Sequence, residues 1–225
     1  YPDHLPPYFG EFPPMHGGEV PGFSLTYFLI MLPGVIFISL LILFPQWFGF
    51  KGGPVKPLPP STKSLPWWFY AGLVTNLFFW WLMWSHSTAF GQLVYWSFTP
   101  LWWGFIFVLD GIVYKRNNGV SLFSTKPKLL VISAFVSILG WAYFEFYDYF
   151  VHGNWYYPNA EHAPWSPTLR SIEFLITYST VTPVLIQWYN LFNTFPKFVA
   201  RYQEGPKWAP NGNHLILIGC LLIGA

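Results

Sequence analysis

The fold of this chain follows from one stretch near its beginning, GFSLTYFLIMLPGVIFISLLILFPQW, which occupies residues 22–47. No residue in this stretch is charged. The apolar core of a lipid bilayer is about 30 Å thick, and a helix rising about 1.5 Å per residue needs roughly 20 apolar residues to cross it. The stretch is long enough, so the sequence predicts a transmembrane helix here.

The remainder of the chain repeats this pattern. Further apolar runs cover residues 66–86, 92–114, 128–150 and 168–192, and a last run begins near His214. From Leu215 to Ala225 that last run would extend about 17 Å as a helix, which is too short to cross. We therefore predict an all-α, polytopic transmembrane helix bundle over residues 22–225, with five complete spans and a truncated sixth that continues past Ala225.

The composition excludes several other classes of protein. Hydrophobic residues make up 53% of the 225 residues and charged residues 9%, whereas soluble proteins carry about 25% charged residues. So apolar a chain is neither soluble and globular nor disordered. The single cysteine, Cys220, excludes a disulfide scaffold, and the few, scattered basic residues exclude a nucleic-acid surface.

The basic residues predict the orientation of the bundle. Apart from Arg170, all lie in alternate loops on one side, at Lys51, Lys56, Lys63, Lys115, Arg116, Lys126, Lys128, Lys197, Arg201 and Lys207. Short cytoplasmic loops are enriched in Lys and Arg. We therefore predict that the N-terminus lies outside and the alternate loops inside, with residues 1–21 forming a Pro-rich extracytoplasmic arm.

Residues inside the apolar runs predict where helices bend and pack. Pro33, Pro100 and Pro183 each remove a backbone hydrogen bond and should bend their helices. Asn76 should bond across to a neighbouring helix. Ser166 followed by Pro167 is typical of the start of a helix.

Ionisable residues gather at the predicted outer ends of the fourth and fifth spans. Glu145 and Asp148 are three residues apart, as are Arg170 and Glu173, so each pair shares one helical face. Three interpretations stay open. In the first, Arg170 neutralises one or two of the carboxylates and the others are solvated. In the second, Glu145, Asp148 or Glu173 is a general acid for a lipid-soluble substrate. In the third, His152 and His162 contribute to a copper or zinc site.

Two other features are interpreted in less reactive terms. Asp110, near the inner end of the third span, is expected to form a snorkelling pair with Lys115 or Arg116. The histidines lie outside the middle of the spans, which argues against a haem b site. The aromatic side chains suit an interfacial belt, and Trp141, Trp155 and Tyr156 are candidates for lining a pocket for a flat or polyene ligand.

Several short motifs resemble an uncharacterised family of bacterial multi-pass membrane proteins. They are Pro100-Leu101-Trp102-Trp103-Gly104, Asp110, Gly119-Val120-Ser121-Leu122-Phe123, Phe144-Glu145 with Asp148, and Asn154-Trp155-Tyr156-Tyr157. The resemblance covers about residues 65–192 and implies no established activity. In that family a similar block recurs further along the chain.

A fainter resemblance is to the membrane lycopene (carotenoid) cyclases. Their acidic residues and aromatic loop are matched here by Glu145 or Asp148, by Gly153-Asn154-Trp155 and by Glu173. Those enzymes begin the later helix with Pro-x-Glu-Glu, whereas this chain has Arg170-Ser171-Ile172-Glu173. The resemblance implies cyclase or isomerase chemistry on a polyprenoid.

These observations and resemblances favour a non-catalytic integral membrane subunit of a larger complex in the bacterial inner membrane, with the N-terminus on the periplasmic side. Its ligands would be lipid, quinone or carotenoid held between aromatic-rich helices, and its partners membrane lipids and other membrane subunits. The alternatives are a polyprenoid cyclase or isomerase and an outer-face copper or zinc site.

Overall fold

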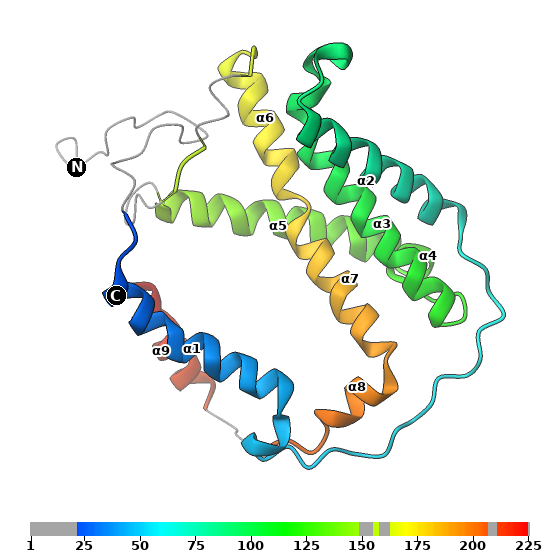
Figure 1. The fold of residues 1–225 in the computed structure, drawn as a ribbon, viewed down its shortest axis with the longest axis vertical. Helices are drawn as coiled ribbons and strands as arrows, with labels where there is room; N and C mark the ends of the chain where they lie inside the picture. Colours follow the sequence, from blue (N-terminus) through cyan, green and yellow to red (C-terminus); the bar gives the residue numbers. More distant parts are fainter. Residues whose placement is uncertain (1–21, 149–154, 158–162, 207–210, 225) are drawn as a thin grey trace. The chain divides into compact units, whose positions relative to one another are not determined.

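Figure 1 shows the fold in a computed structural model, which describes residues 22–148, 155–157, 163–206 and 211–224. Within these residues all regular structure is helical, as predicted, and no strand is present. The helices are α1 (Leu25–Leu43), η2 (Pro45–Phe48), α2 (Trp67–Ser85), η3 (Thr88–Trp96), α3 (Phe98–Arg116), α4 (Leu122–Thr125), α5 (Pro127–Tyr147), α6 (Pro167–Tyr178), α7 (Val181–Asn193), α8 (Pro196–Arg201) and α9 (Gly212–Gly224). The predicted arm, residues 1–21, lies outside the described residues.

The chain divides into two compact units. Helices α2 to α7, with η3, belong to unit 1, and α1, η2, α8 and α9 belong to unit 2. In unit 2, the Arg201 side chain donates to the carbonyl of Leu43 at 2.5 Å, and the Tyr202 hydroxyl donates to the carbonyl of Ile42 at 2.6 Å. Carbonyls at the end of a helix have no partner within the helix, so these side chains cap α1.

Two of the described helices are long and apolar enough to cross a membrane, α1 and α5. A third span arises if η3 and α3, which meet at a bend of 70°, are taken together. The structure therefore supports two to three of the five predicted spans. Helix α2 occupies the predicted range but carries five tryptophans, which are less apolar than aliphatic residues. The run at 168–192 is divided into α6 and α7, each too short to cross alone.

Two of the three prolines explain where apolar runs break. A proline ring collides with the carbonyl of the residue four positions earlier, which is Trp96 for Pro100 and Ser179 for Pro183. The breaks lie just there, between η3 and α3 and between α6 and α7. Pro33, by contrast, lies within the continuous helix α1.

Helices α2 and α3 pack closely along their length in unit 1 (Figure 1). A Cβ atom added at Gly72 would lie 2.7 Å from the carbonyl oxygen of Gly104, so only glycine permits this approach. Asn76 of α2 donates to the carbonyl of Leu101 at 3.0 Å, which confirms the predicted bond between helices. The buried core of unit 1 is formed by Ile106, Leu109, Val113, Leu122, Leu130, Val184 and Leu191.

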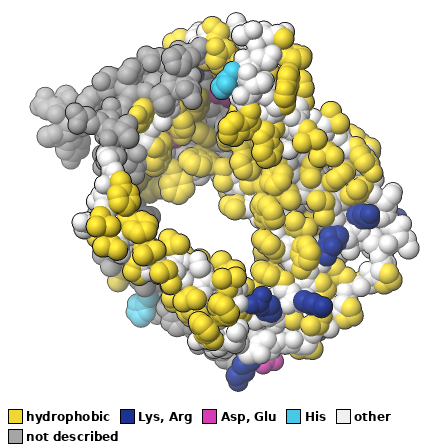
Figure 2. All heavy atoms as spheres, viewed as in Figure 1, with side chains coloured by type: hydrophobic (Ala, Val, Ile, Leu, Met, Phe, Trp, Pro, Cys, Tyr) yellow, Lys and Arg dark blue, Asp and Glu magenta, His cyan; other side chains and the backbone are white. Residues whose placement is uncertain are grey.

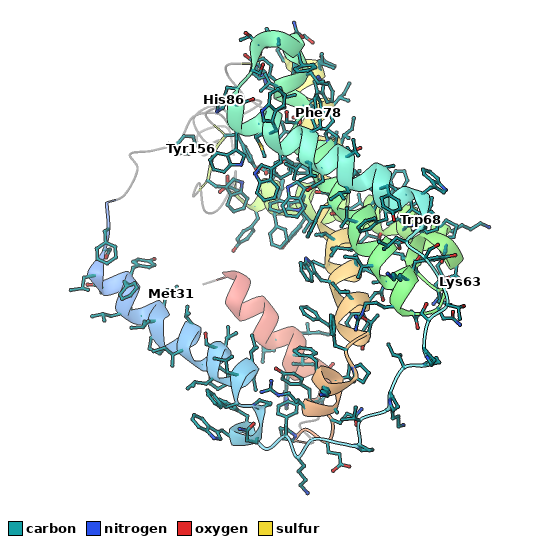
Figure 3. The ribbon with its side chains drawn as sticks, turned by 45° about the vertical axis from the view of Figure 1, so that its right-hand side comes forward. Met31, Lys63, Trp68, Phe78, His86 and Tyr156 are labelled. Atoms are coloured by element: carbon teal, nitrogen blue, oxygen red, sulfur yellow. The ribbon has the colours of Figure 1, made fainter. Side chains whose placement is uncertain are left out.

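The two ends of unit 1 differ in character. Figure 3 shows His86 and Tyr156 at one end and Trp68 and Lys63 at the other. Hydrophobic side chains cover most of the face of unit 1 seen in Figure 2. This surface suits contact with lipid. The end that carries Lys63 is the one where the sequence predicts the basic, inner loops, and the end that carries His86 is the one where it predicts the outer loops.

Candidate functional site

A cavity in unit 1, which we call the larger cavity, lies where both broken helices change direction. It has a volume of about 730 Å³ and is lined by residues of η3, α3, α5 and α6. Ser97 and Thr180, which mark the two breaks, both line it. Non-helical backbone is tolerated at membrane depth where it is buried or lines a cavity, so such breaks would be compatible with a position inside a membrane.

A second cavity, which we call the smaller cavity, has a volume of about 580 Å³. Its walls are mainly aromatic and aliphatic, from α5, α7 and residues 155–157. The three predicted ligand-lining residues, Trp141, Trp155 and Tyr156, all line it. The two cavities share Trp141, Tyr157 and Val181 as lining residues.

Glu145 anchors the aromatic residues around both cavities. Its side chain is 2% exposed, and Oε1 accepts hydrogen bonds from the hydroxyls of Tyr157 at 2.6 Å and Tyr178 at 2.7 Å. The indole nitrogen of Trp155 donates to the same oxygen at 3.4 Å. The other oxygen, Oε2, is buried and has no hydrogen-bond partner among the described residues. We call Trp141, Trp155, Tyr157 and Tyr178 the aromatic wall.

The aromatic wall is held by stacking as well as by Glu145. The rings of Trp141 and Tyr178 stack with centroids 5.6 Å apart and an interplanar angle of 19°. Burial and the neighbouring Glu145 carboxylate raise the pKa of Tyr157 above its ordinary value. Tyr157 is therefore a neutral hydrogen-bond donor at physiological pH.

The other predicted ionisable residues have distinct positions. Asp148 is 2% exposed and accepts a hydrogen bond from the backbone N–H of Trp155 at 3.3 Å. Arg170 and Glu173 both line the larger cavity, consistent with their predicted common face. Among the three candidate acids, then, Glu173 lines a cavity, whereas Glu145 and Asp148 support the residues around it.

The helix that carries Arg170 and Glu173 begins as predicted. Ser166 is the N-cap and its hydroxyl accepts from the N–H of Leu169 at 3.3 Å, with Pro167 in the first turn. Thr177 donates to Glu173 at 2.9 Å, and its hydroxyl lies 2.7 Å from that of Thr99 on α3. Glu173 is thereby linked to the neighbouring broken helix.

The prediction for Asp110 was wrong. Asp110 is fully buried, and its two oxygens accept four hydrogen bonds from neutral donors. Oδ2 accepts from the indole of Trp68 at 3.0 Å and the hydroxyl of Ser121 at 2.7 Å. Oδ1 accepts from the N–H of Phe123 at 2.9 Å and the amide of Gln187 at 2.8 Å.

One of the two expected partners of Asp110, Arg116, is engaged elsewhere. Arg116 donates to the hydroxyl of Thr194 at 2.7 Å and to its carbonyl at 2.8 Å. Its guanidinium carbon also lies 4.2 Å from the ring centroid of Phe195. The carboxylate of Asp110 is fully hydrogen-bonded without a cation, in part because Ser121 and Phe123 fold back over it. The spacing of charged residues in the sequence does not reveal this arrangement.

The predicted metal ligands lie outside the described residues. His152 and His162 both fall in ranges that the structure does not describe. Within the described ranges, no group of three His, Cys, Asp or Glu side chains is arranged to hold a metal ion. The copper or zinc interpretation stays a prediction.

The sequence reasoning missed Ser137, Tyr157 and Tyr178. Ser137 of α5 lies at the break between α6 and α7, where its hydroxyl contacts the backbone. One signal was present, because Ser133 and Ser137 are spaced four residues apart within an apolar run and small polar residues at this spacing are typical of helix contacts in membranes. No comparable signal pairs either tyrosine with Glu145.

The comparisons with known proteins found no matching family model, curated protein or solved structure. The resemblances to the uncharacterised family and to the cyclases therefore stay predictions.

Proposed function

We propose that this chain is a non-catalytic integral membrane subunit that holds a lipid-soluble ligand in the two cavities of unit 1. The proposal includes the five-span topology in a bacterial inner membrane with the N-terminus outside. It is supported by the apolar runs, by the helices suited to crossing a membrane and by the alternation of basic loops. We also propose that the chain is one subunit of a larger membrane complex. Partner subunits should then co-purify with it in mild detergent, and a monodisperse monomer without partners would count against the larger complex.

The single observation that carries the proposal is the pair of cavities sharing an aromatic boundary. Their volumes, about 730 and 580 Å³, lie within the range of small-molecule sites, roughly 300–1,000 Å³. Each has mostly apolar walls with a few polar groups, which is the usual character of such sites. An elongated isoprenoid, quinone or carotenoid has the apolar surface that these walls would bury.

The hydrogen bonds of the acids favour binding over catalysis. Three donors converge on Oε1 of Glu145, and Asp148 accepts from the backbone of Trp155. Both carboxyl groups therefore position the aromatic wall. A general acid must be within reach of its substrate, and neither of these residues lines the larger or the smaller cavity.

One observation favours the alternative of a polyprenoid cyclase or isomerase, since Glu173 lines the larger cavity together with aromatic residues. In that case Glu173 would protonate a double bond and the rings would stabilise the resulting cation. Expression in a lycopene-producing host tests this. A changed pigment profile that is lost in Glu173→Gln would support the enzyme, and an unchanged profile would exclude it for lycopene.

Filling the smaller cavity tests the binding proposal. Gly140 lines this cavity, and a Cβ atom added there would meet nothing within 4 Å. Gly140→Phe should therefore place a ring in the cavity without a backbone clash. Gly34→Phe is the matched control, because Gly34 also lies within a helix, α1, and has open space around it.

The measurement is the amount of isoprenoid and phospholipid extracted by organic solvent from each purified full-length chain. The wild type and Gly34→Phe should each carry a neutral isoprenoid in stoichiometric amount, and Gly140→Phe should carry much less. Equal amounts of every lipid in all three proteins would contradict the proposal.

A further inference from the structure

The polar groups around the larger cavity fall into two sets. The first set is already hydrogen-bonded within the protein. The hydroxyls of Tyr157 and Tyr178 donate to Glu145, the indole of Trp165 donates to Gln92 at 3.2 Å, and the hydroxyl of Thr180 donates to a backbone carbonyl at 2.9 Å. These groups shape the cavity, and their hydrogen-bond donors are not free for a ligand.

The second set includes the side chains of His86, Thr88 and Tyr95. All three line the larger cavity, and none has a hydrogen-bond partner among the described residues. They come from one continuous stretch of the chain, formed by the C-cap of α2 and by η3. Each carries a hydroxyl or an imidazole, a group that can donate or accept a hydrogen bond.

The lining of the larger cavity offers little support for an anionic ligand. Its lining contains one cation, Arg170, and one acid, Glu173, and no lysine. Recognition of phosphate groups normally depends on several basic side chains or on helix N-termini. A lining with a single arginine and an acid lacks this set of basic groups, so a neutral head group is favoured over a prenyl phosphate or a phospholipid.

The shape of the lining favours a planar ring. Phe98, Phe174 and Trp165 line the larger cavity with the stacked pair Trp141 and Tyr178. Flat aromatic walls stack well on a flat ligand. A pure hydrocarbon would pack against these walls, but it would also remove the exposed hydroxyl and imidazole groups of the second set from water without giving them a partner, at a cost for each group.

We infer that the ligand is a quinone-type isoprenoid, with its ring in the larger cavity facing His86, Thr88 and Tyr95 and its isoprenoid tail along the smaller cavity. This inference rests on the proposed function, because it specifies the ligand of the same site. A quinone ring is planar and neutral and carries carbonyl oxygens that accept hydrogen bonds. The apolar residues of the smaller cavity suit a branched hydrocarbon tail.

Equilibrium binding to the full-length chain in lipid nanodiscs tests this inference. The probe is a radiolabelled benzoquinone carrying one isoprenoid unit, and its saturable binding is separated from partition into lipid by empty nanodiscs. Unlabelled quinone should displace the probe, whereas geranylgeranyl phosphate and squalene should not. Direct binding of labelled squalene and of labelled geranylgeranyl phosphate is measured in parallel.

Conservative variants test the named side chains. Tyr95→Phe removes one hydroxyl and should weaken binding about fivefold, and Tyr95→Phe with Thr88→Val should weaken it at least about tenfold. The matched control is Tyr143→Phe with Thr26→Val, because both residues are exposed and line neither cavity. The control should bind like the wild type.

The outcomes separate this inference from the proposed function. The quinone assignment would be overturned if squalene or geranylgeranyl phosphate bound saturably and the quinone did not. The proposed function would still stand in that case. Quinone binding that is equal in the wild type and the double variant would overturn the assigned head-group site. If none of the three probes binds saturably, the proposed function fails and the assignment fails with it.

Discussion

The hydroxyl of Ser137 on α5 donates to the carbonyl of Tyr178 at 2.5 Å, across the break between α6 and α7. The same hydroxyl accepts from the backbone N–H of Thr182 at 3.0 Å. In an unbroken helix this N–H would donate directly to the carbonyl of Tyr178, four residues earlier. One side chain from a neighbouring helix therefore occupies the place of a missing backbone hydrogen bond.

Ser137→Ala should destabilise the protein by about 2 kcal/mol, because a buried carbonyl and a buried N–H both lose their partner. Thermal unfolding in detergent, followed by circular dichroism, measures the effect. Ser133→Ala is the control, since Ser133 is equally buried on α5 but bonds only to the carbonyl of Leu130 in its own helix. Equal melting temperatures for the two variants would contradict the bridging role.

Asp110→Asn should destabilise the protein by about 3 kcal/mol. Each carboxylate oxygen of Asp110 accepts two hydrogen bonds. An asparagine in either amide orientation places its NH₂ group, which cannot accept, against two of these donors, and the hydrogen bonds of both donors are lost. Lys115→Ala should change the stability by less than about 0.5 kcal/mol, because Lys115 is exposed. Denaturant unfolding compares the two; similar losses would restore the interpretation of Asp110 as half of an ion pair.

Alkaline pH should destabilise the wild type more steeply than Tyr157→Phe. The folded-state pKa of Tyr157 is raised, so its contribution is complete below its unfolded pKa of about 10 and is lost as pH rises through the folded value. Melting temperatures measured between about pH 8 and pH 11 give the two slopes. Equal slopes of melting temperature against pH in the two proteins would show that burial beside Glu145 does not protect the Tyr157 hydroxyl from deprotonation.

The orientation can be tested with single cysteines in a Cys220→Ser background. Thr88→Cys, at the start of η3, should react with a membrane-impermeant maleimide added outside intact spheroplasts. Lys126→Cys, between α4 and α5, should react only after the spheroplasts are lysed. The positive-inside rule requires this difference, and labelling of Lys126→Cys in intact spheroplasts would reverse or remove the proposed topology.

The sequence predicted the helices better than their interruptions. The apolar runs at 22–47, 66–86 and 128–150 agree with α1, α2 and α5 to within a few residues, because unbroken runs of this length have no other stable form in lipid. Pro100 and Pro183 were recognised as sites of bending. The breaks lie three to four residues earlier because the ring acts on the preceding turn.

The candidate site was predicted in its composition but not in its connections. Trp141, Trp155 and Tyr156 line one cavity, and Arg170 and Glu173 line the other. The tyrosine partners of Glu145 were not predictable, since Tyr178 is 33 positions away and is placed by the packing of α5 against α6. Asp110 was misjudged for a related reason, because its donor Gln187 is 77 positions away.

The central claim is that the cavities of unit 1 hold an isoprenoid ligand, and site-specific photo-crosslinking in native membranes tests it most directly. Benzoylphenylalanine in place of Tyr156 would lie in the wall of the smaller cavity, and in place of Tyr143 on the exposed surface of α5. Mass spectrometry then identifies the lipid attached at each position. We expect an isoprenoid adduct at position 156 and bulk phospholipid at position 143. The same phospholipid mixture at both positions would contradict it.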